Sequence, residues 1–329
     1  METQDKVELC FPELVNTSCK RPTLHWSEAV LLNIVLSSIS LITVALNLLV
    51  IISVSHFRWL HTPTNILLLS LAVSDLLVGF LLMPGEFFLR TTCWFLGDLV
   101  CCLYNNVSFI ITSASVGDMV LISIDRYVAI CDPLHYPTRI TVPRAKLCVC
   151  MCWLCSVLFS GLILMDGLTH PGRYNSCHGE CVIVINPISG VVDLVLTFIF
   201  PITVIIVLYM RVFVVAVSQA RAMRSHVTGV TLQLSVTLTT KKSELKAART
   251  LGVLVVVYLI CFCPYYCLSV AGDDSLSSTF TSFALYLFYF NSCLNPVIYA
   301  LFYPWFRKAI KLIVFLQILQ PSSREANIL

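Results

Sequence analysis

The last apolar stretch of the chain holds polar side chains where polar groups are costly. No charged residue occurs from 275 to 306, a run long enough to cross a bilayer, yet it contains Asn291, Asn295 and Tyr299. Unsatisfied polar groups in lipid are unfavourable by several kcal/mol each, so we expect these side chains to face inward. Pro296 interrupts the helical hydrogen bonding between them. The pattern predicts a helix that bends around a buried polar cluster.

An acidic residue lies inside another apolar run, from 187 to 210. Asp193 precedes Pro201 by eight residues, which places it about 12 Å nearer the outer surface at the 1.5 Å rise of a helix. An ionisable group at that depth marks a binding site by default, and its carboxylate suits a ligand ammonium. The alternative is a structural residue that is paired within the bundle.

These residues need a membrane-spanning scaffold to position them. The chain has 329 residues, of which 58% are hydrophobic and 12% charged, which leaves too little polar surface for a soluble globule. The sequence therefore predicts an all-α membrane protein, a seven-transmembrane helix bundle that forms a single domain over 1–329. Besides the last stretch, six runs have the length of a membrane span: 30–54, 66–89, 101–124, 147–165, 187–210 and 251–271.

The distribution of basic residues predicts the orientation. With the N-terminus outside, five of the 21 Lys and Arg residues lie in outer segments and sixteen in cytoplasmic ones. We therefore expect a multi-pass plasma-membrane protein with an extracellular N-terminus at 1–28, a third cytoplasmic loop region at 212–248 and no removable signal peptide. The net charge of +3 follows from this sorting and requires no nucleic-acid partner.

The segment 305–329 is predicted to form a short amphipathic interfacial helix and a cytoplasmic tail. Tyr303-Pro304 predicts a bend, and basic and apolar residues mix from Trp305 to Ile313 at a spacing that separates them on a helix. Such a helix rests on the lipids of the anionic inner leaflet or contacts a protein partner. No cysteine follows Cys293, which excludes a palmitoyl anchor on this tail.

The sixteen cysteines divide into two groups. Those within the spans are expected to be free and to pack as small apolar residues. Asn16-Thr17-Ser18 is a glycosylation sequon on the exposed N-terminus, whereas the same pattern at Asn106 lies inside a span, so Asn16 is the credible acceptor. The outer cysteines can meet an oxidising compartment, where some should be bridged: Cys10, Cys19, Cys93, Cys101, Cys102, Cys177 and Cys181.

A set of residues occurs in order along the chain, each in its own span or near its end: Asn47, Asp75, Asp125-Arg126-Tyr127, Trp153, Pro201, Tyr209, Pro264 and Asn295-Pro296-Val297-Ile298-Tyr299. With this set the whole chain resembles the rhodopsin-like G protein-coupled receptors. The resemblance implies a receptor rather than an enzyme, a disulfide from Cys101 to Cys181, and a two-state switch that opens a cavity for a G protein.

The same resemblance implies roles for individual residues. Glu244 would pair with Arg126 in the resting state; the alternative is a solvated carboxylate at the end of a loop. The other switch residues would be Asp125, Tyr127, Tyr209, Asn295, Pro296 and Tyr299. An inward polar cluster would hold an allosteric sodium ion, or else a hydrated network with no specific ion: Asp75, Ser115, Asn291 and Asn295. No other cofactor is expected.

Several positions depart from the family pattern. Phe262 replaces the usual Trp two residues before Pro264, and Tyr258 replaces Phe one turn below, so the switch is expected to be retuned. Ser108, 18 residues before Arg126, stands where amine receptors carry an aspartate. The usual amine anchor is therefore absent, and Asp193 would take its place.

Within the family, the run from Asn291 to Ala309 resembles the trace amine-associated receptors, and Asp193 with Ser108 is similar to fish members whose amine-binding acid lies on the fifth helix. The resemblance implies an olfactory receptor for amines that couples to a stimulatory G protein and cyclic AMP. It also implies a second bridge, from Cys177 to Cys10 or Cys19. The expected ligand-binding residues are Asp193, Ser108, Phe109, Thr112, Phe262, Tyr265, Tyr266, Tyr289 and Glu86.

Two other acidic residues compete for a role. Glu86 is either a second anchor for a diamine or, as we expect, an exposed charge at the rim. Asp118 lies about 15 Å deeper than Ser108 and is expected to accept a hydrogen bond from the Trp153 indole.

The sequence bears on three alternative functions: a light-sensing pigment, a transporter, and a receptor for a peptide or a lipid. A light-sensing pigment needs a lysine in the seventh span, and none occurs between Lys246 and Lys308. A transporter could use Asp75, Asp118 and Asp193 as a proton relay, but these residues fit receptor positions. A receptor for a peptide or a lipid stays open, because the amine assignment depends on Asp193 and the family resemblance.

Overall fold

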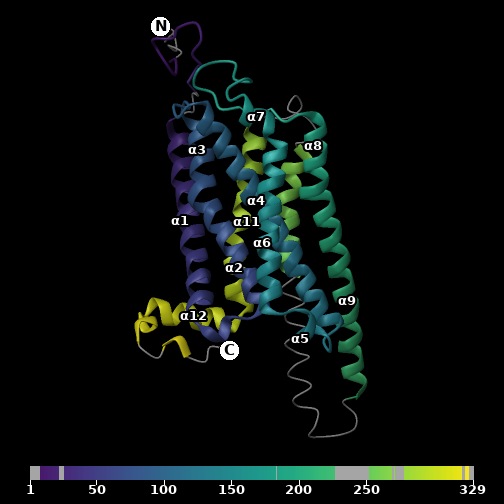
Figure 1. Cartoon of the computed structure of the whole chain (residues 1–329). Coiled ribbons are helices and arrows are strands. Elements are labelled where there is room, and N and C mark those ends of the chain that lie inside the picture. Colours follow the sequence, from purple (N-terminus) through teal and green to yellow (C-terminus); the bar gives the residue numbers. More distant parts are fainter. Residues whose placement is uncertain are drawn as a thin grey trace.

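The computed structural model describes residues 8–21, 26–182, 184–226, 252–268, 270, 278–320 and 323–325. Within these residues six helices are long and apolar enough to cross a membrane, and Gly252–Leu268 is a shorter apolar helix between the last two of them along the chain. Together the seven form the bundle in Figure 1. The fold class predicted from the sequence is confirmed.

The first span is α1 (Trp26–His56), followed by a short turn, η1 (Arg58–Leu60). The second and the fifth span each contain a π-helical segment, in which the backbone hydrogen bonds are wider than in an α-helix. The remaining elements are α2 (Pro63–Leu77), η2 (Val78–Leu82), α3 (Met83–Thr91), α4 (Asp98–Cys131), α5 (Tyr136–Arg139), α6 (Val142–Ile163), α7 (Met165–Thr169), α8 (Pro187–Asp193), η3 (Leu194–Ile199), α9 (Phe200–His226), α11 (Ser278–Phe302), α12 (Pro304–Val314), η5 (Gln317–Leu319) and η6 (Ser323–Glu325).

The helices extend beyond the apolar runs that predicted them. The third span, α4, runs from Asp98 to Cys131 rather than from 101 to 124, and α9 continues to His226, inside the region assigned to the third cytoplasmic loop. Hydropathy reports the part of a helix that lies in lipid, whereas helical hydrogen bonding continues into the polar boundary. The remainder of that loop region lies outside the described residues.

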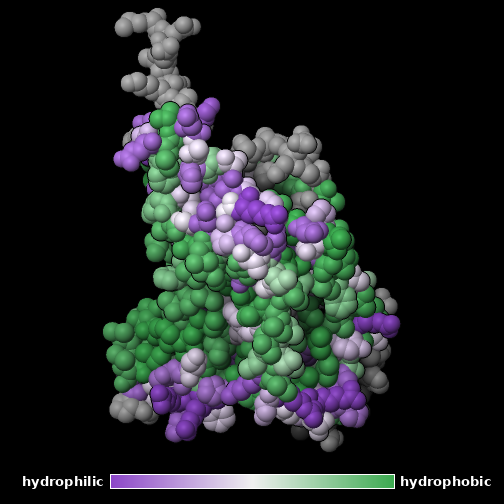
Figure 2. Space-filling model, turned by 45° about the horizontal axis from the view of Figure 1, so that its top comes forward, coloured by the Kyte–Doolittle hydropathy of each residue, from purple (hydrophilic) through white to green (hydrophobic). Residues whose placement is uncertain are grey.

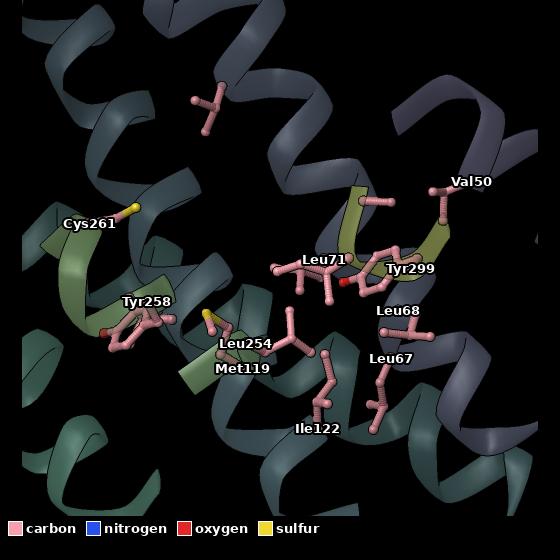
Figure 3. Close-up of a cluster of buried hydrophobic side chains, with 14 of the residues drawn as sticks. Val50, Leu67, Leu68, Leu71, Met119, Ile122, Leu254, Tyr258, Cys261 and Tyr299 are labelled. Atoms are coloured by element: carbon pink, nitrogen blue, oxygen red, sulfur yellow. The ribbon is translucent and has the colours of Figure 1, made fainter. Parts of the chain in front are cut away.

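The core forms where the second, third, sixth and seventh spans meet. Figure 3 shows Leu71 and Tyr299 close together, with Met119 and Leu254 nearby. Leu71, Tyr299 and Tyr258 are almost completely buried. Since lipid is as apolar as this core, close van der Waals packing rather than the hydrophobic effect holds the helices together. Burial is uneven: nine of the 15 residues of α2 are buried, but only Ala145, Ser156 and Ser160 of the 22 in α6, which is therefore peripheral.

A band of hydrophobic surface surrounds the bundle. Figure 2 shows this band between hydrophilic regions at the two ends of the molecule. Its exposed residues include Leu41, Leu162 and Leu301. Because so much apolar surface is exposed on a helical bundle, the chain is a multi-pass membrane protein.

The predicted interfacial helix is present as α12. It follows a bend at Tyr303, where the backbone becomes extended, and it buries Trp305, Phe306 and Ala309 against the bundle. The Nη1 atom of Arg307 donates to the carbonyls of Ala300 and Leu301, both at 2.9 Å, and so satisfies the end of α11. The helix is thereby fixed to the inner end of the seventh span.

Three disulfides connect the outer segments. Cys101 at the start of α4 is bonded to Cys181, the pairing that the sequence favoured. Cys19 rather than Cys10 is bonded to Cys177, which resolves the alternative left open by the sequence. Cys10 is bonded instead to Cys93, a pairing that the sequence did not indicate.

These bonds hold the N-terminal segment across the outer loops. A hydrogen bond of 2.9 Å from the Cys19 amide to the His178 carbonyl adds to the disulfide between the same two segments. Asn16 is exposed on this segment, whereas the Nδ2 atom of Asn106 is buried within α4. Asn16 is therefore the accessible one of the two sequons.

Candidate functional site and switch

Asp193 is the last residue of α8 and directly precedes the π-helical segment η3. A π-helical turn inserts an extra residue, which changes the direction in which the following side chains point. The side chain of Asp193 is partly buried. Among the described residues, no Lys, Arg or His forms an ion pair with it. An ion pair within the bundle, the structural alternative for Asp193, is therefore not seen there.

Thr197 holds this carboxylate in place. Its Oγ1 atom donates to the Asp193 carbonyl at 2.7 Å and lies 3.3 Å from Asp193 Oδ1. The same hydroxyl is 3.1 Å from the hydroxyl of Tyr266, on the helix Gly252–Leu268. One threonine thus links the acidic residue of the fifth span to an aromatic residue of the sixth.

A narrow cavity of about 60 Å³ lies beside Asp193, inside the bundle. A wider hollow of about 440 Å³ adjoins it and shares Phe109, Asp193, Tyr265 and Tyr266. Asp193 is the one charged residue among those that line either space. The inner cavity is lined by Ser108, Phe109, Thr112, Ser113, Asp193, Thr197, Tyr265, Tyr266, Leu285, Phe288 and Tyr289.

The structure brings most of the predicted ligand residues together. Two of them, Phe262 and Glu86, do not line the inner cavity. Glu86 on α3 is partly buried rather than an exposed charge at the rim. The residues that sequence reasoning missed include Thr197 and Phe288. Thr197 could have been found from its spacing, because a residue four positions after Asp193 lies on the same helical face.

An aromatic stack leads from the cavity toward the core. The ring of Tyr266 stacks on that of Phe198 with centroids 4.3 Å apart, and the ring centroids of Phe288 and Phe262 are also 4.3 Å apart. The ring centroid of Phe262 in turn lies 4.2 Å from that of Tyr258. Movement of the rings at the cavity therefore has a packed route to the middle of the bundle.

The predicted polar cluster is assembled around Asp75. The Nδ2 atom of Asn295 donates to Asp75 Oδ2 at 2.8 Å, and Ser115 is buried on the neighbouring α4. Three of the buried oxygens without a hydrogen-bond partner among the described residues belong to this cluster: Oδ1 of Asp75, of Asn291 and of Asn295. Oxygen donors without a proton suit a hard cation, so these residues fit the sodium ion that the resemblance implies.

The inner end of α4 holds a closed polar network. Arg126 donates from Nε to Asp125 Oδ2 at 2.9 Å, and its Nη2 atom also contacts the Thr64 hydroxyl. Asp125 accepts further hydrogen bonds from Thr64 and from the Tyr136 hydroxyl, each at 2.9 Å. Burial raises the pKa of the Tyr136 phenol, which keeps it a neutral donor. The sequence did not indicate Thr64 and Tyr136; Glu244, the other predicted partner of Arg126, lies outside the described residues.

The remaining switch residues lie between this network and the core. Tyr127 packs against buried Ile130 and Val212. Tyr209 contacts Gly252 so closely that a Cβ at that glycine would meet the Tyr209 hydroxyl at 2.1 Å. A side chain at position 252 would therefore have to displace the Tyr209 ring from the contact between the fifth and sixth spans.

The expected contact between Asp118 and Trp153 is wrong in detail. Trp153 donates from Nε1 to the Ser70 hydroxyl at 3.0 Å, and Ser70 donates to Asp118 Oδ2 at 2.7 Å. The hydroxyl of Ser70 relays the interaction because it lies between the two side chains. Asp118 is buried and hydrogen-bonded within the bundle, so its structural role stays a prediction.

Comparisons with known proteins agree with this arrangement. The sequence model of the family "7 transmembrane receptor (rhodopsin family)" matches residues 46–299. The chain is similar to trace amine-associated receptor 13c of Danio rerio, at 38% identity over 98% of the chain and 97% of that receptor. It is also similar to trace amine-associated receptor 8a of Rattus norvegicus (37%, covering 98% and 96%) and receptor 1 of Macaca mulatta (33%, covering 96% and 96%).

Proposed function

Since the chain belongs to the rhodopsin family of seven-transmembrane receptors and, within it, to the trace amine-associated receptors, we propose that it is an olfactory receptor for small amines. The ligand ammonium pairs with Asp193 on the fifth span. The occupied receptor couples to a stimulatory G protein and raises cyclic AMP. The observation that carries the proposal is the carboxylate of Asp193 in an aromatic-lined cavity, with no cationic side chain paired to it among the described residues.

The cavity offers an ammonium group two kinds of attraction. A hydrogen bond between charged groups contributes about 1.5–3 kcal/mol, and a cation over an aromatic face adds about 0.5–2 kcal/mol. Tyr265, Tyr266 and Tyr289 supply such rings around Asp193. A neutral ligand would leave the carboxylate buried without a counter-charge, which is costly. The lining therefore favours a cation.

The number of carboxylates bears on the class of amine. Ser108 stands at the third-span position of the usual anchor, and Asp193 is the only acidic residue among those lining the cavity and its outer hollow. The site therefore binds one ammonium group, which belongs to a monoamine or to one end of a diamine. The outer loops carry further acids such as Asp166, whose pKa is lowered by a hydrogen bond from Tyr174. Ionised groups there attract cations toward the entrance.

Signal transfer would use the contacts already described. An amine bound at Asp193 shifts Thr197 and Tyr266, and the aromatic stack passes the change to Tyr258. Release of Arg126 from its network would then open the inner end of the bundle for the G protein. The ligand acts by binding one of two packed arrangements more tightly than the other.

The test is a cyclic AMP assay on cells that express the receptor, screened with mono- and diamines. We expect Asp193→Asn to abolish the response at equal surface expression. Asp166→Asn is the matched control, because it removes an outer carboxylate that does not line the cavity. An unchanged response in Asp193→Asn would move the anchor to Glu86 or Asp118. A receptor that answers to peptides or lipids but to no amine would overturn the proposed ligand class, and amine uptake would indicate a transporter.

A further inference from the structure

A second hollow, which we call the lipid-facing groove, opens on the outside of the bundle and measures about 530 Å³, within the size range of ligand sites. It lies between α4, α6 and the fifth span, whose positions Figure 1 shows. Its lining residues come in three helical stripes. They are Ser113, Val116, Gly117, Val120 and Leu121 of α4; Cys148, Met151, Cys152, Cys155, Ser156 and Phe159 of α6; and Leu196, Thr197, Phe200 and Pro201 of the fifth span.

The groove runs lengthwise along the bundle. Its α6 residues recur at the three- and four-residue spacing of one helical face, from Cys148 to Phe159. At 1.5 Å per residue this stripe is about 16 Å long. That is about half of the roughly 30 Å hydrocarbon core of a bilayer, and because the stripe is central in its span it lies at the depth of the acyl chains.

The mouth of the groove faces the membrane interior. Met151 and Leu196 are each 50% exposed and Phe200 is 59% exposed, although all three lie in the middle of membrane-spanning segments. They belong to the exposed apolar surface of the bundle, and α6 buries only Ala145, Ser156 and Ser160 of its 22 residues. The molecules that reach this opening are therefore those of the bilayer.

Three polar groups of the lining already form hydrogen bonds within the chain. The Ser156 hydroxyl donates to the Cys152 carbonyl at 2.9 Å, and the Cys152 thiol donates to the Ala114 carbonyl at 3.7 Å. Thr197 donates to the Asp193 carbonyl. These donors point toward the backbone, so apart from the Ser113 hydroxyl the surface of the groove is hydrocarbon and sulfur. Such a surface suits an occupant that needs no hydrogen bond, which a lipid acyl chain is.

The groove and the Asp193 cavity share a wall. Ser113 of α4 and Thr197 of the fifth span line both spaces and so form the wall between them. Thr197 is also the residue that holds the Asp193 carboxylate and contacts the Tyr266 hydroxyl. A chain in the groove therefore packs against the residue that orients the ligand-binding acid.

We propose that the lipid-facing groove binds one acyl chain of a bilayer phospholipid, and that its occupancy fixes Thr197 and thereby raises the affinity of the inner cavity for its ligand. The binding part is independent of the ligand class. The coupling part rests on the proposed amine function.

Binding is tested by photo-crosslinking. The full-length receptor in phosphatidylcholine nanodiscs receives a phosphatidylcholine with a diazirine in its acyl chain, and labelled peptides are mapped by mass spectrometry. We expect labelling of Met151, Cys155 and Leu196 to exceed that of Leu154 and Val157, lipid-exposed residues outside the groove, by at least about threefold. Equal labelling of the two groups overturns the site. Labelling of the groove by a diazirine sterol in preference to the phospholipid overturns the choice of occupant.

Coupling is tested with two matched variants. Cys155→Trp fills the groove, whereas Cys150→Trp places the same side chain at another exposed cysteine of α6 that does not line it. We expect Cys155→Trp alone to lower lipid labelling and to raise the half-maximal amine concentration by at least about threefold. Met151→Trp is the second groove-filling variant if Cys155→Trp does not reach the surface.

Lowered labelling with unchanged amine potency overturns the coupling. If no amine activates the native receptor, the labelling pattern still decides the site, and basal cyclic AMP replaces amine potency as the readout. Failure of the groove and failure of the amine proposal are then separate results.

Discussion

Thr197 illustrates how much one hydroxyl can organise. It donates to the Asp193 carbonyl, lies beside the Asp193 carboxylate and contacts Tyr266, and so joins two spans at the ligand cavity. The valine side chain has nearly the same shape but no hydroxyl, so Thr197→Val removes these contacts while the packing stays. We expect amine potency in the cyclic AMP assay to fall about tenfold, which is about 1.4 kcal/mol.

The matched variant Thr197→Ser keeps the hydroxyl and should retain most of the potency. A loss in the serine variant as large as that in the valine variant would show that the methyl group, and not the hydroxyl, is what the site requires.

The cluster around Asp75 gives a second prediction at the scale of single residues. One oxygen of the buried Asp75 carboxylate and the amide oxygens of Asn291 and Asn295 have no hydrogen-bond partner, a deficit that a sodium ion would satisfy. A sodium ion held there would stabilise the resting arrangement. Replacing the potassium of the buffer with sodium at constant ionic strength should therefore lower agonist affinity. Asp75→Asn should abolish that sensitivity. Agonist binding to the native receptor that is indifferent to sodium would favour a hydrated network without an ion.

At the scale of the elements, α5 closes the inner end of α4. Tyr136 at its start donates to Asp125 at 2.9 Å, alongside Arg126 and Thr64. Removing this donor with Tyr136→Phe should weaken the resting network by about 1 kcal/mol and raise basal cyclic AMP by up to about fivefold. Tyr174→Phe, which removes a hydroxyl from an outer loop, is the control and should leave basal signalling unchanged. A basal level equal to native in both variants would show that the network does not restrain the receptor.

The elements also show where sequence reasoning stops. Apolar runs located all seven helices, because a bilayer requires about 20 apolar residues per span. The π-helical segments were not predicted, since a change in backbone hydrogen bonding leaves no trace in composition. One of them, η2, contains Gly79, whose carbonyl accepts a hydrogen bond from Ser40 at 2.6 Å; the other, η3, follows Asp193 directly. The irregular turns thus lie at contacts that shape the bundle and its site.

The candidate site was predictable to a similar extent. Asp193 was recognisable because a carboxylate in an apolar run needs a reason, and the tyrosines of the sixth span followed from the family resemblance. Contacts between side chains on different spans could not be read from spacing, as the Ser70 relay between Trp153 and Asp118 shows. The same holds for the Cys10–Cys93 disulfide, because the partner of a cysteine depends on where the loops lie in space.

For the whole molecule, the asymmetry of basic residues predicts an extracellular N-terminus. Asn16 on the disulfide-anchored N-terminal segment should then carry a glycan, whereas Asn106 should not. Glycosidase treatment should increase the gel mobility of the native receptor and of Asn106→Gln but not of Asn16→Gln. A glycosidase-sensitive Asn16→Gln protein would contradict either the orientation or the choice of acceptor.

The central claim is that a positive charge on the ligand is read by Asp193. The most direct measurement compares the half-maximal concentration of an active amine with that of the alcohol of equal chain length, in the native receptor and in Asp193→Asn. We expect the native receptor to prefer the amine by at least about 100-fold, or about 2.7 kcal/mol, and the preference to disappear in the variant at equal surface expression. A preference for the amine that survives in Asp193→Asn would contradict that claim.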